Sequence, residues 1–170
     1  MDLSAQEVSW IFQKLKELQN LSTYSASDLE QLIERMEKRS YAIRDTIIKQ
    51  GDEGEFFFII YKGQVGISVK QGNKATLIAS LADGDYFGEM SLITNKPCIA
   101  TVTAIIPTDV FMLPHDDLRF MLLHNPALVK SMSQVVEERR KELFQELGIL
   151  TNMEDDLLTK LQKYFDLQQE

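Results

Sequence analysis

The chain has 170 residues, a net charge of -8 at pH 7 and a single cysteine. This length is typical of one domain with its own core, and a lone cysteine excludes an internal disulfide framework and fits a reducing compartment. The acidic balance holds for residues 1–110 and for the remainder alike, which argues against a nucleic-acid surface, because phosphate binding needs a basic face. The sequence does not open on a signal peptide, and no apolar run approaches the roughly 20 residues that span a bilayer, so we expect a cytoplasmic protein without membrane or nucleic-acid partners.

Two amphipathic helices are expected first, over residues 4–20 and 27–39. Each opens with a serine followed three residues later by a glutamate, Ser4 with Glu7 and Ser27 with Glu30. In this capping-box pattern each side chain bonds the backbone N–H group of the other residue. Apolar residues then recur at helical spacing along both segments.

Short β-type runs separated by turn residues follow the helices. The expected strands are 41–48, 56–61, 64–70, 75–81, 99–106 and 109–113. Regular spacing with glycine-containing turns is typical of a β-barrel, a sandwich or a jelly roll. The longer break from Tyr86 to Pro97 contains a segment, 88–93, that predicts one short helix inside the β region.

Helical patterns return after Pro114. Residues 115–123 predict one helix, and Pro126 suits the first turn of a long helix that ends near Leu147. These patterns divide the chain into N-terminal helices (1–40), a β-roll (41–114), C-terminal lid or dimer helices (115–147) and an extra helix (148–170). The expected fold class is therefore α+β.

The segment 83–104 carries the residues that indicate binding chemistry. Gly88 lets the backbone approach a ligand closely, because it has no Cβ. A short helix that starts just after Gly88 directs free N–H groups outward, and such groups bind phosphate. Glu89 is placed either to accept hydrogen bonds from a sugar hydroxyl or to cap the helix itself. The strand expected at 99–106 closes the pocket.

On these residues the sequence resembles the cyclic nucleotide-binding domain family, which includes catabolite activator proteins, the regulatory subunit of cAMP-dependent protein kinase and cyclic nucleotide-gated channels. The resemblance covers roughly residues 20–145. Its landmarks occur in the family's order: Ile48 to Asp52, Phe57 to Gly63, Gly84, Phe87-Gly88-Glu89, and Pro97 to Ala104. It implies an antiparallel β-roll, a double-stranded β-helix of jelly-roll type, flanked by N-terminal and C-terminal helices.

The resemblance also implies a phosphate-binding cassette at residues 87–101. In the family, the residues that match Gly88 and Glu89 contact the ribose, and backbone N–H groups near Met90 and Ser91 hold the cyclic phosphate. The candidate ligand-binding residues are Phe87, Gly88, Glu89, Met90, Ser91, Cys98, Ile99, Ala100 and Thr101. The implied ligand is a cyclic nucleotide, and no other cofactor and no metal is expected.

Three positions depart from the family pattern. Cys98 stands where an arginine normally pairs with the phosphate, Ile99 replaces a small or hydroxyl residue, and Arg44 stands where the family has a glycine. A charge-assisted hydrogen bond is worth about 1.5–3 kcal/mol, so its loss weakens binding roughly tenfold to over a hundredfold. Lys96 is a candidate substitute charge, although a loop lysine is more often simply solvated. The sequence therefore predicts that the ribose half of the pocket is intact and that the phosphate half is damaged.

No catalytic or metal-binding motif is evident in the sequence. Two histidines, His115 and His124, are too few for a metal site in the β-roll, and neither a nucleophile motif nor a Walker-type loop is present, so we expect no enzyme activity. Asp83-Gly84-Asp85 is interpreted as a hairpin turn rather than a calcium loop, and Phe56-Phe57-Phe58 as a buried strand rather than a base-stacking platform. Cys98 is interpreted as a small residue beside a core strand rather than a redox thiol.

We expect the C-terminal helices to pass on the effect of ligand binding. The helix after Pro126 has a narrow apolar stripe at heptad spacing, which suits packing on the β-roll and a homodimer or partner-protein seam about equally. The acidic segment after Leu147 is too short for a DNA-binding domain. The leading hypothesis is a regulatory sensor in which cAMP, cGMP or a related nucleotide moves these helices. The alternative is a degenerate fold that binds no nucleotide and serves as an interaction or dimerisation scaffold, and a third hypothesis is another anionic ligand at the same helix N-terminus.

Overall fold

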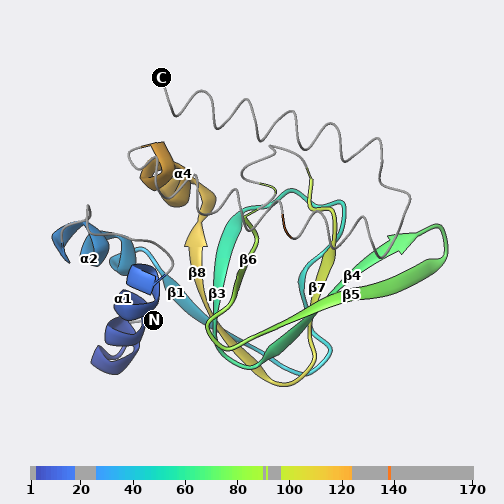
Figure 1. Cartoon of the computed structure of the whole chain (residues 1–170), viewed down its shortest axis with the longest axis horizontal. Coiled ribbons are helices and arrows are strands. Elements are labelled where there is room, and N and C mark those ends of the chain that lie inside the picture. Colours follow the sequence, from blue (N-terminus) through green and yellow to red (C-terminus); the bar gives the residue numbers. More distant parts are fainter. Residues whose placement is uncertain (1–2, 18–25, 90, 92–96, 124–137, 139–170) are drawn as a thin grey trace.

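The computed structural model describes residues 3–17, 26–89, 91, 97–123 and 138. Its elements are α1 (Ala5–Glu17), α2 (Ala26–Glu34), β1 (Glu37–Tyr41), β2 (Thr46–Ile48), β3 (Phe56–Lys62), β4 (Gln64–Gln71), β5 (Lys74–Ala82), β6 (Tyr86–Phe87), β7 (Thr101–Ala104), β8 (Thr108–Pro114) and α4 (His115–Leu123). The strands form two open four-stranded sheets, β1-β8-β3-β6 and β2-β7-β4-β5 (Figure 1). All strand pairs are antiparallel, so the expected β-roll with flanking helices is confirmed and no closed barrel forms.

Strand β3 supplies side chains to two separate cores. Phe57 and Ile59 face the helices and join residues of α1, α2 and α4 in one apolar cluster. Phe58 and Ile60 face the other way, into the space between the two sheets. Successive side chains of a strand point to opposite faces, so a strand that is buried on both faces needs an unbroken apolar run. The expected reading of the phenylalanine run as a buried strand is therefore confirmed.

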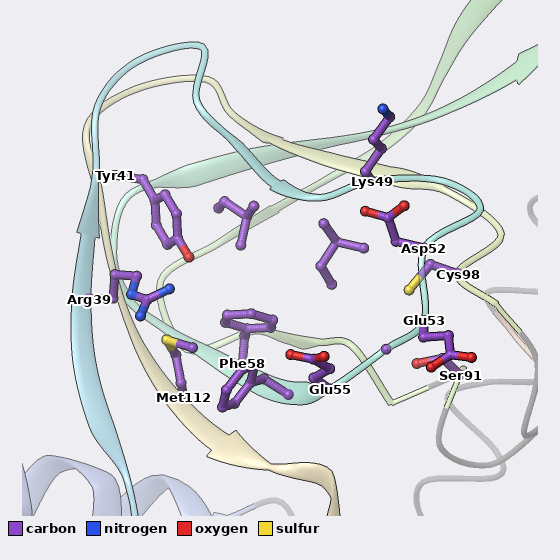
Figure 2. Close-up of a pocket in the computed structure, with 14 residues that line it drawn as sticks. Arg39, Tyr41, Lys49, Asp52, Glu53, Glu55, Phe58, Ser91, Cys98 and Met112 are labelled. Atoms are coloured by element: carbon purple, nitrogen blue, oxygen red, sulfur yellow. The ribbon is translucent and has the colours of Figure 1, made fainter.

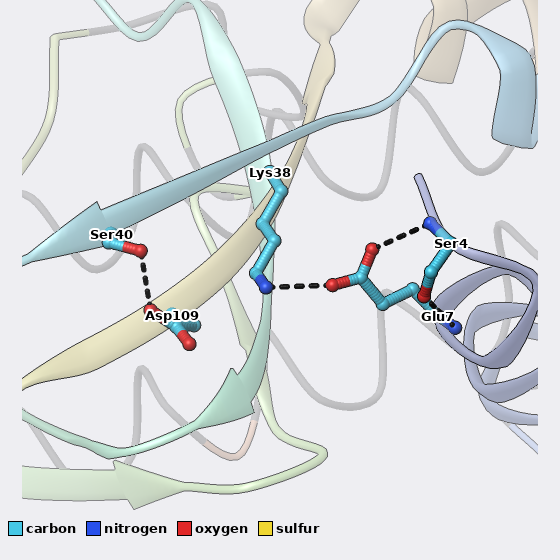
Figure 3. A network of polar contacts seen from close by, with 5 residues as sticks. All are labelled: Ser4, Glu7, Lys38, Ser40 and Asp109. Carbon is cyan, nitrogen blue, oxygen red and sulfur yellow. Dashed lines mark hydrogen bonds and ion pairs between the residues drawn. The ribbon is translucent and has the colours of Figure 1, made fainter. Parts of the chain in front are cut away.

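The N-terminal helix is tied to the sheet by a network of polar contacts (Figure 3). The expected capping box is present: the Glu7 N–H donates to Ser4 Oγ at 3.1 Å, and the Ser4 N–H donates to Glu7 Oε2 at 2.9 Å. Lys38 Nζ of β1 donates to Glu7 Oε1 at 2.7 Å, and further along β1 Ser40 Oγ donates to Asp109 Oδ1 at 2.6 Å. The Lys38 hydrogen bond lowers the pKa of the Glu7 carboxyl, and the same bond raises the pKa of the Lys38 ammonium group.

Two predicted boundaries are wrong. The second helix ends at Glu34 rather than at residue 39, because residues 37–41 form strand β1, which pairs with β8 along its whole length. The single strand predicted at 41–48 is two strands, separated by a turn in which Arg44 has a left-handed φ of 74°. Glycine adopts that conformation at little cost, so the backbone at this position has the form that a glycine favours although an arginine occupies it.

The other strands of the expected roll and helix α4 lie within a few residues of the predicted bounds. Strand β6 was not predicted, because two residues are too few to show a period. In the turn before β6, Asp83 Oδ1 accepts from the Gly63 N–H at 2.7 Å and Asp85 Oδ2 accepts from the Ala82 N–H at 2.9 Å. These carboxylates serve the backbone, which confirms a turn rather than a calcium loop.

Part of what the sequence predicts lies outside the described residues. This part comprises most of the short helix at 88–93, the helix that ends near Leu147, the segment 148–170, and the positions Met90 and Lys96. The domain bounds and the lid or dimer role of the C-terminal helices therefore stay predictions. Within the residues that can be described, no helix is both long enough and apolar enough to cross a bilayer.

Candidate functional site

The candidate site begins where β6 ends. Phe87 belongs to the core between the sheets, where its ring stacks on Phe58 with centroids 4.8 Å apart and planes 12° apart. Gly88 has a left-handed φ of 89°, and a Cβ there would lie 2.6 Å from the carbonyl oxygen of Phe56. Only glycine satisfies both conditions, so Gly88 fixes the direction in which the chain leaves the core and enters the cassette.

Glu89, the predicted ribose contact, is fully buried. Burial of a carboxylate is costly unless the surrounding structure compensates it, so the fold holds this side chain at a defined position. The Glu89 side chain has no solvent-accessible surface and does not line the cavity of this site.

Ser91 packs against the turn that precedes β3. A Cβ on Gly54 would overlap Ser91 Oγ and would lie 2.9 Å from His115 Cε1, so the turn approaches the cassette this closely only because residue 54 is glycine. The buried Ser91 hydroxyl has no oxygen or nitrogen hydrogen-bond partner in the described part of the chain. It faces the thiol of Cys98, which is a weak partner, and so it retains hydrogen-bonding capacity for a ligand.

Cys98 is fixed by the same turn. The Gly51 N–H donates to the Cys98 carbonyl, and the Cys98 N–H donates to the Asp52 carbonyl, both at 2.8 Å. Next to it, the Gln50 N–H donates to Thr101 Oγ1 at 3.0 Å. Burial raises the pKa of the Cys98 thiol and the Asp52 carboxylate adds to this effect, while Ser91 opposes it. The residue is therefore a neutral thiol at pH 7, and its amide is already used by the fold.

A cavity of about 220 Å³ opens beside these residues, between β1, β2, β3 and the turn (Figure 2). Its lining residues are Arg39, Tyr41, Ile47, Ile48, Lys49, Asp52, Glu53, Gly54, Glu55, Phe56, Phe58, Ser91, Cys98 and Met112. Its wall combines apolar side chains, such as Phe58 and Met112, with charged ones. Figure 2 shows the Cys98 sulfur and the Glu55 carboxylate directed into the cavity.

The two ends of the cavity differ in charge. Asp52 and Glu53 lie at the end formed by the cassette, beside Cys98 and Ser91, and Glu55 lies between this end and Phe58, whereas the guanidinium of Arg39 lies at the opposite end (Figure 2). Lys49 also belongs to the wall, but its ammonium group points away from the cavity (Figure 2). The cassette end is therefore acidic in the structure, at the place where the family resemblance expects a phosphate.

His115 joins the cassette to helix α4, of which it is the first residue. Its ring is buried, and Nε2–H donates to the Gly88 carbonyl at 2.7 Å. Its backbone N–H donates to the Glu55 carbonyl at 2.9 Å. Through these two hydrogen bonds His115 connects both the cassette and the turn to the start of α4. No group of three or more metal-ligating side chains exists in the described ranges, and His115 serves this contact instead.

The structure brings together only part of the predicted site. Of the nine candidates, Ser91 and Cys98 line the cavity, and Phe87 is a core residue. Gly88, Glu89, Ile99, Ala100 and Thr101 lie in the adjoining chain segments without lining this cavity, and Met90 lies outside the described residues. Arg39, Tyr41 and the carboxylates of residues 52–55 were missed. The turn sequence Gly-Asp-Glu-Gly-Glu was the available signal, but it was interpreted as a break between strands and, at Gly51-Asp52, as a landmark of the family resemblance, and not as a binding segment.

Fold and cassette together define a β-roll of the cyclic nucleotide-binding type. The family model described as "Cyclic nucleotide-binding domain" matches residues 38–125, just over half of the chain. The chain belongs to this family, as the sequence predicts.

Three known proteins illustrate the similarity. The cAMP-dependent protein kinase regulatory subunit of Mycosarcoma maydis is 38% identical over 86 residues, which is 50% of this chain and 16% of that protein. A regulatory subunit of a cAMP-independent protein kinase A from Trypanosoma cruzi, bound to guanosine, superposes with a TM-score of 0.69 at 20% identity, covering 82% of this chain and 50% of that one. The regulatory domain of Toxoplasma gondii PKA with cAMP gives 0.65 at 22% identity, covering 96% and 59%. The chain thus spans only a small part of the kinase subunit that it matches in sequence.

Proposed function

We propose that this domain is a non-catalytic regulatory module that binds a ribose-containing ligand at its cassette and moves its C-terminal helices in response. The observation that carries the proposal is the preserved turn at Phe87-Gly88-Glu89, in which a strictly required glycine leads into a buried carboxylate. Relatives that are regulatory subunits of protein kinases support a signalling role rather than catalysis.

The coupling step follows from the contacts of His115. A ligand that contacts Gly88 or Ser91 acts on the segment whose carbonyl accepts the His115 hydrogen bond. Because His115 begins α4, the ligand-bound and ligand-free cassettes favour different positions of that helix. A ligand shifts such an equilibrium only by its difference in affinity for the two arrangements. We propose cAMP, cGMP or a related ribose compound as the ligand, in line with relatives that hold cAMP and guanosine.

The test is a binding screen on the whole chain with a conformational readout. Calorimetry with cAMP, cGMP and their nucleosides measures binding, and hydrogen–deuterium exchange of α4 measures coupling. The proposal expects saturable binding by at least one compound and altered protection of His115–Leu123. Absence of binding at millimolar concentration contradicts it.

The second candidate is a scaffold that binds no nucleotide and associates through its C-terminal helices with a second copy or a partner protein. Cys98 favours it, because the thiol replaces the cation that pairs with phosphate in the family. Sedimentation analysis distinguishes the two functions: the scaffold predicts an association that is indifferent to all the ligands screened.

A further inference from the structure

We infer that the ligand of this site is an uncharged nucleoside rather than a cyclic nucleotide, an inference that rests on the proposed ligand-binding function. A cyclic nucleotide carries one negative charge on its phosphate, and a nucleoside carries free 3′ and 5′ hydroxyl groups in its place. The cassette end of the cavity repels the phosphate charge of a cyclic nucleotide and offers hydrogen-bond acceptors to the hydroxyl groups of a nucleoside.

The repulsion comes from carboxylates that have no ion-pair partner in the described part of the chain. Asp52, Glu53 and Glu55 belong to the wall of the cavity, and none of them forms an ion pair with a described residue. The two cations of the wall do not help: Lys49 points away, and Arg39 lies at the far end beside Tyr41 and Met112 (Figure 2). These carboxylates are exposed to solvent, which weakens each repulsion without cancelling it.

Among the described residues, Cys98 also offers little to a phosphate at this end. The Cys98 side chain carries no positive charge, and its backbone N–H is bonded to the Asp52 carbonyl at 2.8 Å. A phosphate placed here would lose water without gaining a charged partner, which is unfavourable. A nucleoside fits the same groups better. Its hydroxyl groups donate to the carboxylate of Glu55, which is directed into the cavity, and pair with the buried hydroxyl of Ser91 (Figure 2).

Calorimetry of the full chain with guanosine and adenosine, each paired with its 3′,5′-cyclic monophosphate, tests the inference. We expect each nucleoside to bind at least about tenfold more tightly than the matching cyclic nucleotide, since the cyclic phosphate meets repulsion and loses water without gaining a charged partner. Raising the salt from about 50 to about 300 mM screens charge, so it should strengthen cyclic nucleotide binding and leave nucleoside binding unchanged.

A variant that removes two of the charges sharpens the test. Asp52→Asn with Glu55→Gln should improve cyclic nucleotide affinity about tenfold, or about threefold per carboxylate, and should weaken nucleoside binding, so that the ratio of the two affinities moves toward the cyclic form. Glu30→Gln on α2 is the matched control, because Glu30 is exposed and does not line the cavity. That control should leave the ratio of nucleoside affinity to cyclic nucleotide affinity unchanged. Melting curves verify that all variants fold.

The outcomes separate this inference from the function on which it rests. If a cyclic nucleotide binds wild type more tightly than its nucleoside, or if salt weakens its binding, the inference is overturned and the regulatory sensor stands. If neither kind of compound binds at millimolar concentration, the proposed sensor function is contradicted together with the inference, and the scaffold function is favoured. Preferential nucleoside binding with the stated salt dependence supports both.

Discussion

Restoring the cation that the family places at the phosphate should create cyclic nucleotide binding in this chain. The change is Cys98→Arg together with Ile99→Ala, which installs a guanidinium and removes bulk beside it. The structure accommodates it: the Cys98 sulfur points into a cavity of about 220 Å³ whose wall holds the carboxylates of Asp52 and Glu55 (Figure 2). An arginine therefore finds both space and counter-charges that hold it in place.

The magnitude follows from the bond that is gained. One charge-assisted hydrogen bond is worth about 1.5–3 kcal/mol, which corresponds to a gain of roughly tenfold to over a hundredfold in affinity for cAMP or cGMP. Titration calorimetry of wild type and variant, with the matching nucleosides run in parallel, measures this gain. Nucleoside affinity should change much less, because a nucleoside presents no phosphate.

The matched control adds a polar side chain without the charge. Cys98→Gln with Ile99→Ala fills much of the same space with a neutral, flexible side chain, so it should gain little. An equal gain in both variants would show that volume rather than charge limits binding. No gain in an arginine variant that melts like wild type would refute the assignment of residue 98 to the phosphate.

Four further outcomes are expected. Lys38→Met should cost about 1 kcal/mol of folding stability at pH 7, and the difference should vanish as the pH falls through the lowered pKa of Glu7, as chemical denaturation across pH will show. Arg44→Gly should raise folding stability by up to about 1 kcal/mol in the same assay. The left-handed conformation costs a non-glycine residue about 1–2 kcal/mol, and part of this gain is offset because glycine gives the unfolded chain more conformational entropy. Gly88→Ala should lower stability by about 1–3 kcal/mol, by combining backbone strain with a clash. Cys98, whose thiol pKa is raised by burial, should react with iodoacetamide at pH 8 more slowly in the folded chain than in the unfolded chain.

Three of these outcomes have a control or a contradicting result of their own. The pH dependence of the ion pair follows from both partners. Because folding lowers the pKa of Glu7, this residue stabilises the fold above its unfolded pKa, and that stabilisation is lost in acid. Because folding raises the pKa of Lys38, the stabilisation from this residue persists until the pH rises above about 10.4. A Lys38→Met difference that is constant from pH 3 to pH 7 would contradict the ion pair. For Arg44, an asparagine variant should also stabilise, since asparagine tolerates the left-handed region. Faster alkylation of folded than of unfolded chain would contradict the burial of Cys98.

The fold was predictable because its signals are local. The apolar run of strand β3 predicts burial on both of its faces. The spacing of Ser4 and Glu7 predicts the capping box that the structure contains. Strand β1 was not predictable in the same way. Its residues Glu-Lys-Arg-Ser-Tyr are polar and continue a helical pattern, and only pairing with β8 makes them a strand. Tertiary context overrides such local preference.

The site was predictable only in its chain-local part. Gly88 followed from a motif, and the structure explains it by the Phe56 carbonyl that a side chain would meet. The wall of the cavity comes from segments far apart in the sequence: Arg39 from β1, Glu55 from the turn before β3 and Met112 from β8. No spacing along the chain links these positions, so the acidic character of the cassette end emerges only when the fold assembles them.

The most direct test of the account is a nuclear magnetic resonance titration of the ¹⁵N-labelled chain with guanosine and, separately, with cGMP. The account predicts saturable shifts of the backbone amides of Gly88, Ser91 and Thr101 that extend to His115 and along α4, at lower concentrations of guanosine than of cGMP. Shifts confined to another surface, or no saturable shifts with either compound at millimolar concentration, would contradict a ligand-sensing cassette in this domain.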